Sequence, residues 1–454
     1  MNPLLAHGIG GVRDLPVPTW LFLYGAGVVL VVSFVALGVL WRRPLLERYR
    51  PGRPLPSLVQ RIVLSRALRI VAGLLSFGLL VVVALAALLG SRTPAFNLAP
   101  TFVYVVFWLG LVPVVVLLGN VWPALNPWKA AADAVSWLAQ RLGLELEGGA
   151  YPDRLGYWPA AILLALFTAL ELAYDDPASP RVLALAIFLY SGITWIGALL
   201  CGREEWFRRG DGFSVYFGLL SRMAPFAVEE QAGERRVVAR PPIVGLASLG
   251  APGPGMLAFV SVMLGSVAFD GLSRTSRWLD WRASFSDAVP GAGDLAAFAF
   301  NLAGLVATIA LVALAYLLAT KTAELVAHAG ADLARAFVAS LVPIALVYAV
   351  SHYFSLLLVQ GQFALPLASD PLGRGWDIFG TADFRPDLTP LAPNTVWYFQ
   401  VGTLVAGHVA GLVLAHDRAL SLLGTTRRAL RTQYPLLVLM VAYTVGGLWL
   451  LSLE

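Results

Sequence analysis

The sequence has few of the charged residues that let a folded chain face water on every side. Only 13% of its 454 residues are charged, whereas 58% are hydrophobic. Soluble domains carry about 25% charged residues, so a chain of this composition lacks the charge to cover itself in water. The composition therefore excludes an ordinary soluble protein of two or three domains, which the length alone indicates.

Cysteine and lysine are also nearly absent. Cys201 is the only cysteine, so no disulfide forms within the chain, and zinc ribbons and iron–sulfur motifs are excluded. The only lysines are Lys129 and Lys321, which leaves arginine to supply the net charge of +5. The sequence has no G-x-S-x-G, H-E-x-x-H or P-loop motif, and this argues against the enzymes that those motifs mark.

What the chain has instead is a series of apolar stretches of about 20 residues, the length that crosses a bilayer as a helix. The sequence predicts spans at 18–41, 67–90, 100–119, 157–174, 181–202, 253–272, 295–320, 336–359, 394–415 and 434–453. The first is too long for the apolar core of a signal peptide, so we expect it to be retained. We predict an all-α, polytopic transmembrane helix bundle of about ten spans, forming one integral membrane domain over residues 1–454.

The arginines predict how this bundle is oriented. The loops after the odd-numbered spans carry 23 lysines and arginines, against about 8 at the N-terminus and in the other loops. The richer side is expected to be cytoplasmic, which places both termini outside. Segments 120–156 and 203–252 are then cytoplasmic, and segments 273–294 and 360–393 are outside. Topology explains the positive charge, so we expect the lipid bilayer as partner and no nucleic acid.

Histidines within apolar spans are costly in a bilayer and are candidates for function. His352 lies in span eight, and His408 lies in span nine between small residues that include Gly407 and Gly411. Such spacing permits close helix approach. The His352 imidazole is able to ligate a metal, relay a proton or bond to a neighbouring helix. A paired metal or haem site with His408 is also open and requires the two rings to face each other. His416, at the end of span nine, is interpreted as an interfacial anchor.

The predicted outer face gathers further polar residues. Histidine and carboxylate groups together are able to bind a divalent metal and activate water, although aspartate before proline or glycine is also ordinary turn chemistry. The candidate metal or polar site consists of His7, Asp14, Asp270, His352 and Asp377. Arg13 and Trp376 are the candidates for orienting a substrate.

Three segments carry a resemblance to a known family: 7–16 (His-Gly-Ile-Gly-Gly-Val-Arg-Asp-Leu-Pro), 352–358 (His-Tyr-Phe-Ser-Leu-Leu-Leu) and 407–418, which ends in His-Asp-Arg. They resemble bacterial multipass proteins, chiefly actinobacterial, that are labelled fenitrothion hydrolase. The resemblance implies a phosphotriester hydrolase in the bacterial cytoplasmic membrane. It also implies a small lipophilic substrate that reaches an outer-leaflet site from the bilayer. The arginine-rich, lysine-poor composition agrees with a high-GC bacterial source.

Two other functions stay open at this point. One is a non-enzymatic permease or assembly subunit that handles a small solute or a metal, which broken helices near Pro113 and Pro343 would favour. The absence of a convincing internal repeat weakens that interpretation. The other is a redox protein with histidine ligands.

Overall fold

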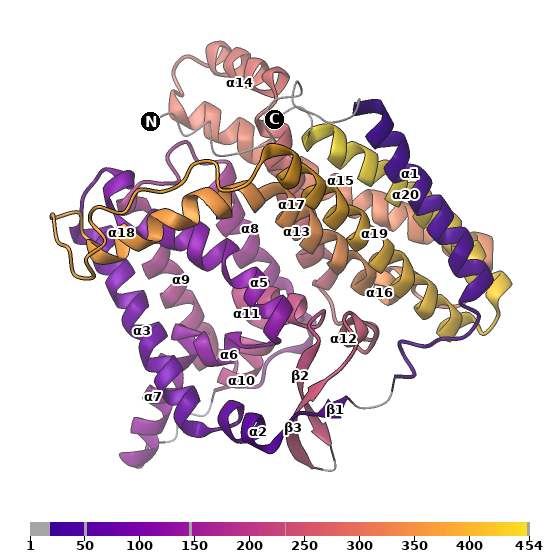
Figure 1. The fold of residues 1–454 in the computed structure, drawn as a ribbon, viewed down its shortest axis with the longest axis horizontal. Coiled ribbons are helices and arrows are strands. Elements are labelled where there is room, and N and C mark those ends of the chain that lie inside the picture. Colours follow the sequence, from indigo (N-terminus) through magenta and orange to yellow (C-terminus); the bar gives the residue numbers. More distant parts are fainter. Residues whose placement is uncertain (1–18, 50–51, 145–147, 232, 452–454) are drawn as a thin grey trace.

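The chain folds into a bundle of long helices with one small sheet at one end (Figure 1). The computed structural model describes residues 19–49, 52–144, 148–231 and 233–451. Within these ranges nearly every element is helical, which confirms the predicted all-α class.

Each predicted span corresponds to a helix or to a run of consecutive helices. In chain order these are α1 (Thr19–Leu40), α3 (Arg66–Leu89), the run α4–η4–α5 (Leu98–Leu118), the run η5–α8 (Asp153–Leu172), α9 (Pro180–Cys201), α13 (Met256–Ser273), α15 (Asp294–Ala327), the run α16–η7–α17–η8–α18 (Leu333–Ser369), α19 (Pro393–Leu423) and α20 (Thr426–Leu451). In the part of the chain that the structure describes, eight of them, all except α1 and α20, are long and apolar enough to cross a membrane.

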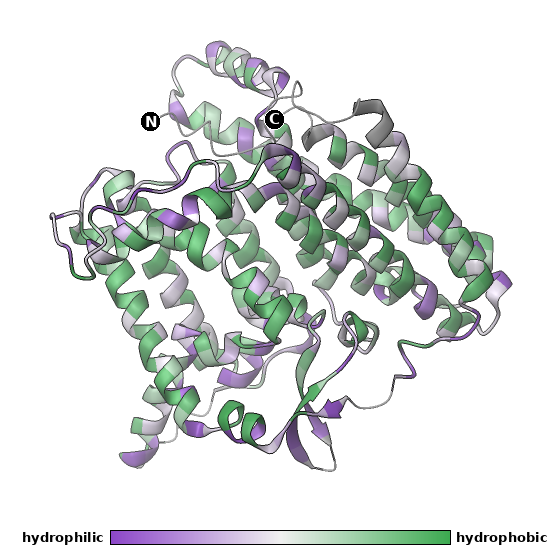
Figure 2. Ribbon diagram, viewed as in Figure 1, coloured by the Kyte–Doolittle hydropathy of each residue, from purple (hydrophilic) through white to green (hydrophobic). Residues whose placement is uncertain are grey.

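Large apolar side chains lie exposed along these helices rather than only inside the bundle. Val32, Leu75, Leu185 and Leu318 are each between 59% and 71% exposed. Colouring by hydropathy shows apolar residues along the helices and polar residues mainly at the two ends (Figure 2). A surface of this kind fits a lipid environment, because lipid tails solvate apolar side chains that water does not.

The connecting segments divide between the two ends of the bundle as the sequence predicts. At the upper end in Figure 1 lie α14 (Ser276–Ala288) and the loop that follows α18 (Ala364–Ser369). At the lower end lie α2 (Ser57–Val63), α6 (Trp122–Leu125), α7 (Pro127–Arg141), α10 (Arg203–Glu205), α12 (Val244–Ala247) and the sheet. The segments predicted to face outside therefore share one end, and the cytoplasmic ones share the other.

The three-stranded sheet was not expected from the sequence. β2 (Phe226–Gln231) and β3 (Glu234–Ala239) form an antiparallel hairpin, and β1 (Arg53–Pro54) adds to the other edge of β3. Gln60 of α2 fastens this edge, because its amide donates to the Val237 carbonyl at 2.7 Å and accepts from the Val237 N–H at 2.7 Å. The sheet thus joins the α1–α3 connection to segment 203–252.

Two of the spans are interrupted near the prolines that the sequence singled out. η4 (Phe102–Leu109) is a π-helix that precedes Pro113 in α5 (Leu111–Leu118). In the other span η7 (Val338–Leu341) is a 3₁₀ turn, and Pro343 lies in the first turn of α17 (Val342–Gln360). Proline has no N–H to donate and its ring crowds the preceding turn, so regular hydrogen bonding fails there. Departures from regular α-helix near Pro113 and Pro343, the feature that would favour a permease, are therefore present.

α17 and α19 pack closely along the small residues beside His408. A Cβ atom added at Gly407 would lie 2.2 Å from Val347 Cγ2, and one at Gly411 would lie 2.7 Å from the Ser340 carbonyl oxygen. No side chain fits there without movement of the neighbouring helix. The small residues Gly407 and Gly411 therefore permit the close helix approach that the sequence predicts.

A buried polar cluster fixes the end of α19 to the residues after α1. Asp417, fully buried, accepts hydrogen bonds from Trp41 Nε1 at 2.9 Å and from the backbone N–H groups of residues 45, 46 and 47. His416 Nε2 donates to the Trp41 carbonyl oxygen at 2.9 Å, and its Nδ1 accepts from Gln433 Nε2 at 2.8 Å. His416 is fully buried, so the interpretation of this residue as an interfacial anchor is wrong.

Candidate functional site

Asp270 and His352, two of the predicted site residues, meet inside the bundle. Asp270 lies near the end of α13 and His352 lies in α17. The imidazole Nε2 is 2.8 Å from Asp270 Oδ2, and both side chains are almost completely buried. Burial of a polar group costs free energy unless the group is hydrogen-bonded. The contact therefore lowers the free-energy cost of burying both the carboxylate and the imidazole.

Arg274 completes the environment of the Asp270 carboxylate. Its Nε and Nη2 atoms lie 3.0 Å and 2.9 Å from Asp270 Oδ1. The two residues are four positions apart on α13, the spacing that brings side chains to one face of a helix. Both carboxylate oxygens of Asp270 are thus engaged, one by the guanidinium and the other by the imidazole.

A cavity of about 160 Å³ lies beside this group. The interrupted span contributes Trp108, Leu109, Val112 and Pro113 to its wall, and α17 contributes six residues that include Tyr353. Other walls come from α8 (Trp158–Leu172), α11 (Gly212–Ser221), α13 and α19. Two aromatic pairs shape the wall: Trp108 stacks on Tyr216 with ring centroids 4.5 Å apart, and Phe354 stacks on Phe399 at 4.1 Å.

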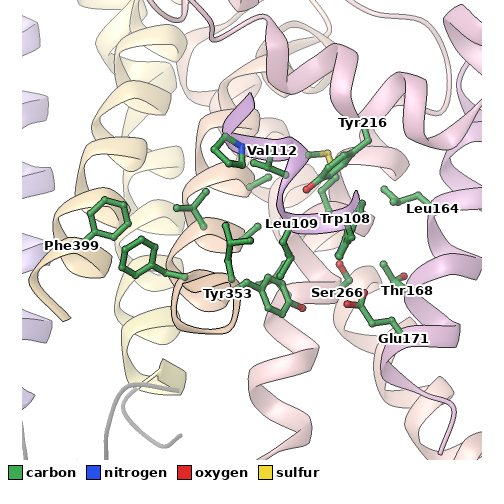
Figure 3. A pocket seen from close by; sticks show the side chains of 18 residues that line it. Trp108, Leu109, Val112, Leu164, Thr168, Glu171, Tyr216, Ser266, Tyr353 and Phe399 are labelled. Carbon is green, nitrogen blue, oxygen red and sulfur yellow. The ribbon is translucent and has the colours of Figure 1, made fainter. Parts of the chain in front are cut away.

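One end of the cavity is polar. Thr168 and Glu171 of α8, Ser266 of α13 and the Tyr353 phenol supply oxygen atoms there, whereas Leu109, Val112 and Phe399 form apolar wall (Figure 3). The Thr168 hydroxyl donates to the Ala165 carbonyl oxygen at 3.1 Å, so its lone pairs remain able to accept.

Glu171 is the residue of this site that sequence reasoning missed. Its carboxylate lines the cavity, and the charges of Asp270 and Arg274 act on it. The signal was available, because an acidic residue within an apolar span is costly and usually functional. It was missed because Glu171 lies close to the end of predicted span four, where a carboxylate is also able to reach water.

Asp377 and Trp376 lie in the loop after α18 and make local contacts. Asp377 Oδ1 accepts from Ser369 Oγ at 3.0 Å and from the N–H groups of Thr381 at 2.7 Å and Ala382 at 3.0 Å. Desolvation alone would raise the pKa of Asp377, but these hydrogen bonds outweigh it and hold the pKa below its ordinary value. Trp376 is 43% exposed, and the guanidinium of Arg374 lies 5.8 Å from the centre of its ring. Neither residue lines the cavity.

The remaining predicted residues are not joined to this group. His7, Arg13 and Asp14 lie outside the described residues. His408 Nδ1 donates to the Leu404 carbonyl oxygen of its own helix at 2.8 Å, while His352 Nε2 is held by Asp270. Across residues 19–451, apart from the short gaps named above, no three histidine, cysteine or acidic side chains are grouped to hold a metal ion. The outer metal site as a whole, with His7 and Asp14 in it, stays a prediction.

The eight long apolar helices indicate a multipass membrane protein. Comparison with known proteins adds no relative: no protein-family model, curated protein or solved structure matches the chain.

Proposed function

We propose that this chain is a bacterial cytoplasmic-membrane permease that binds a small, largely apolar solute in the cavity beside Asp270 and His352 and moves it across the bilayer. The observation that carries the proposal is the position of the cavity, which lies among the apolar spans and is lined by an interrupted helix.

The interrupted helices support a permease. Irregular backbone at membrane depth leaves polar groups without their helical partners, and it is tolerated where it is buried in protein or lines a cavity. Trp108 and Leu109 of η4 and the following Pro113 all line this cavity. Short π-helical segments inside α-helices are frequent at functional sites, and transporters bind their solutes where membrane helices are discontinuous.

The buried ionisable group supports the same function. His352 and Arg274 both contact Asp270 between α13 and α17, and Glu171 lines the adjoining cavity. Acidic residues and histidines inside a membrane bundle are rare and often serve as proton relays. A proton taken up or released here would couple solute movement to the proton gradient.

Transport by purified protein in liposomes tests the proposal. Phenyltrimethylammonium and benzenesulfonate are permanently charged single-ring solutes that a bilayer excludes. We expect uptake of at least one of them to require the protein and to disappear in Ala349→Trp, which fills the cavity from the wall of α17. Uptake that is equal in protein-free liposomes, or unaffected by Ala349→Trp, would contradict the proposal.

A membrane-bound phosphotriester hydrolase is the second candidate, and the Asp270–His352 contact favours it. A carboxylate that orients an imidazole is the arrangement of a general base. Arg274, 2.9 Å from Asp270, would offer positive charge to a phosphoryl oxygen. Under this proposal the purified protein hydrolyses a chromogenic phosphotriester, and His352→Asn abolishes the turnover. His328→Asn, at an exposed histidine, would leave it intact.

A further inference from the structure

Among the described residues, the cavity is lined by one acidic side chain, Glu171, and by no basic one. Asp270 has Arg274 on one carboxylate oxygen and His352 on the other. Glu171 has no hydrogen bond or ion pair among the residues that the structure describes, and no lysine, arginine or histidine lines the cavity. The polar end of the cavity therefore presents one carboxyl group that forms no ion pair with a described residue.

We propose that the cavity takes a small lipophilic monocation whose positive group lies at Glu171 and whose apolar part lies against the aromatic wall. This inference rests on the proposed permease function and names its solute class. The cation replaces the missing counter-ion, because an ionised carboxylate in apolar surroundings is stable only with a partner.

The remaining walls suit the same ligand. The hydroxyl oxygens of Thr168 and Ser266 lie at the Glu171 end and are able to accept hydrogen bonds from an ammonium group (Figure 3). Trp108 and Tyr216 supply stacked aromatic surface, and aromatic faces attract cations through the ring quadrupole. An anion would meet repulsion from Glu171, whereas the charges of Asp270 and Arg274, which both act on this end of the cavity, oppose each other.

Volume limits the ligand to about one ring. The cavity measures about 160 Å³, and an engineered protein cavity of about 150 Å³ binds benzene. Benzylammonium, a cation at pH 7, is therefore a suitable probe. Benzyl alcohol is its neutral counterpart with the same number of heavy atoms, and benzoate is an anion of similar size.

Calorimetric titration of the full-length protein in lipid nanodiscs with these three probes tests the inference. We expect benzylammonium to bind about tenfold tighter than benzyl alcohol, since a cation–π contact or a charge-assisted hydrogen bond contributes roughly this factor. Benzoate should bind more weakly than either. Glu171→Gln should reduce the preference for the cation to about onefold while benzyl alcohol still binds. Glu234→Gln, at an exposed glutamate of β3, should keep the wild-type preference for benzylammonium.

Several outcomes overturn the inference. If Glu171 holds a proton and donates it to a neutral ligand, benzyl alcohol binds as tightly as benzylammonium and Glu171→Gln changes neither. Preference for benzoate, or binding of none of the three, overturns it as well. Should Glu171→Gln fail to fold, the preference of the wild-type protein decides alone.

The same experiments separate this inference from the permease function. Benzylammonium binding without protein-dependent uptake of phenyltrimethylammonium would leave the inference standing and remove the transport function. Protein-dependent uptake of benzenesulfonate alone would support transport and overturn the inference, because benzenesulfonate is an anion and the inference requires a cation.

Discussion

His352 Nε2 lies 2.8 Å from Asp270 Oδ2, and this contact joins α17 to α13 in the buried interior. Removal of the imidazole takes away one hydrogen-bond partner of the Asp270 carboxylate and leaves Arg274 in contact with it. Leaving a buried carboxylate without one of its hydrogen-bond partners costs about 1–3 kcal/mol. We therefore expect His352→Asn to lower the apparent unfolding temperature in detergent.

The matched control for this variant is His328→Asn. His328 is exposed and its backbone has φ of +50°, a conformation that asparagine adopts readily. The same change of side chain should therefore leave the unfolding temperature nearly unaltered. Equal shifts in the two variants would show that the Asp270–His352 contact contributes little to stability.

The approach of Asp270 to His352 shows how far the sequence predicts this site. Both residues interrupt apolar stretches, and the charge pattern of the loops assigned the end of α13 and the second half of α17 to one side of the bundle. Hydropathy and loop charge therefore predicted both depth and side. They did not predict that Asp377, on the same side, makes its hydrogen bonds within its own loop.

Which helices are neighbours depends on packing that a single sequence does not encode locally. Glu171 belongs to α8, whereas Trp108 and Pro113 belong to the run before it, and they meet only because the cavity lies between their helices. The β2–β3 hairpin was missed for another reason. Its strands are six residues each, and such a short polar stretch has no signal comparable to that of a span.

Gly411 allows α19 to pack closely against the backbone of η7, and its replacement should be destabilising. A Cβ atom at this position would lie 2.7 Å from the Ser340 carbonyl oxygen, which belongs to the backbone and cannot rotate away. Overpacking of this kind costs about 1–3 kcal/mol. We expect Gly411→Ala to lower the apparent unfolding temperature.

Gly402→Ala on the same helix is the control. No atom lies within 4 Å of a Cβ added at Gly402, and alanine is favoured over glycine in a helix by about 1 kcal/mol. This variant should therefore be neutral or slightly stabilised. A loss of stability equal to that of Gly411→Ala would contradict the close-packing argument.

Replacement of Asp417 should lower the stability of the fold. Replacement by alanine leaves the N–H groups of Leu45, Leu46 and Glu47 without their acceptor. A buried donor left unsatisfied costs about 1–3 kcal/mol. These hydrogen bonds are part-buried, so the whole change should reduce stability by at least about 1 kcal/mol. Thermal unfolding followed by tryptophan fluorescence measures this loss.

Asp153→Ala provides the comparison. The Asp153 side chain is 95% exposed and its ion pair with Arg209 lies at 3.2 Å. Exposed pairs contribute about 0–1 kcal/mol. If Asp153→Ala and Asp417→Ala shift the unfolding temperature equally, the Asp417 cluster does not hold the residues after α1 in place.

The loop around Asp377 should lose order in acid. Because hydrogen bonds hold the pKa of Asp377 below its ordinary value of 3.8, its ionised form favours the folded loop. That contribution is present above pH 3.8 and is lost as the pH falls below this value towards the pKa of the folded state. Amide hydrogen exchange at Thr381 and Ala382, corrected for its intrinsic pH dependence, should show protection at pH 7 that disappears in acid. In Asp377→Ala the protection should be low at both pH values, and retained protection would contradict the assignment.

The orientation predicted from the arginines is testable with single cysteines, because the chain has only Cys201 to remove. In a Cys201→Ala background, Trp376→Cys places a thiol on the exposed loop after α18, and Glu234→Cys places one on exposed β3. Translocation of arginine-rich loops is unfavourable, so a membrane-impermeant maleimide added to intact cells should label only residue 376. Both should react after permeabilisation. Labelling of residue 234 alone would show that the bundle has the opposite orientation, with the Asp270–His352 contact nearer the cytoplasmic face. Labelling of both residues in intact cells would contradict the separation of the two ends by lipid.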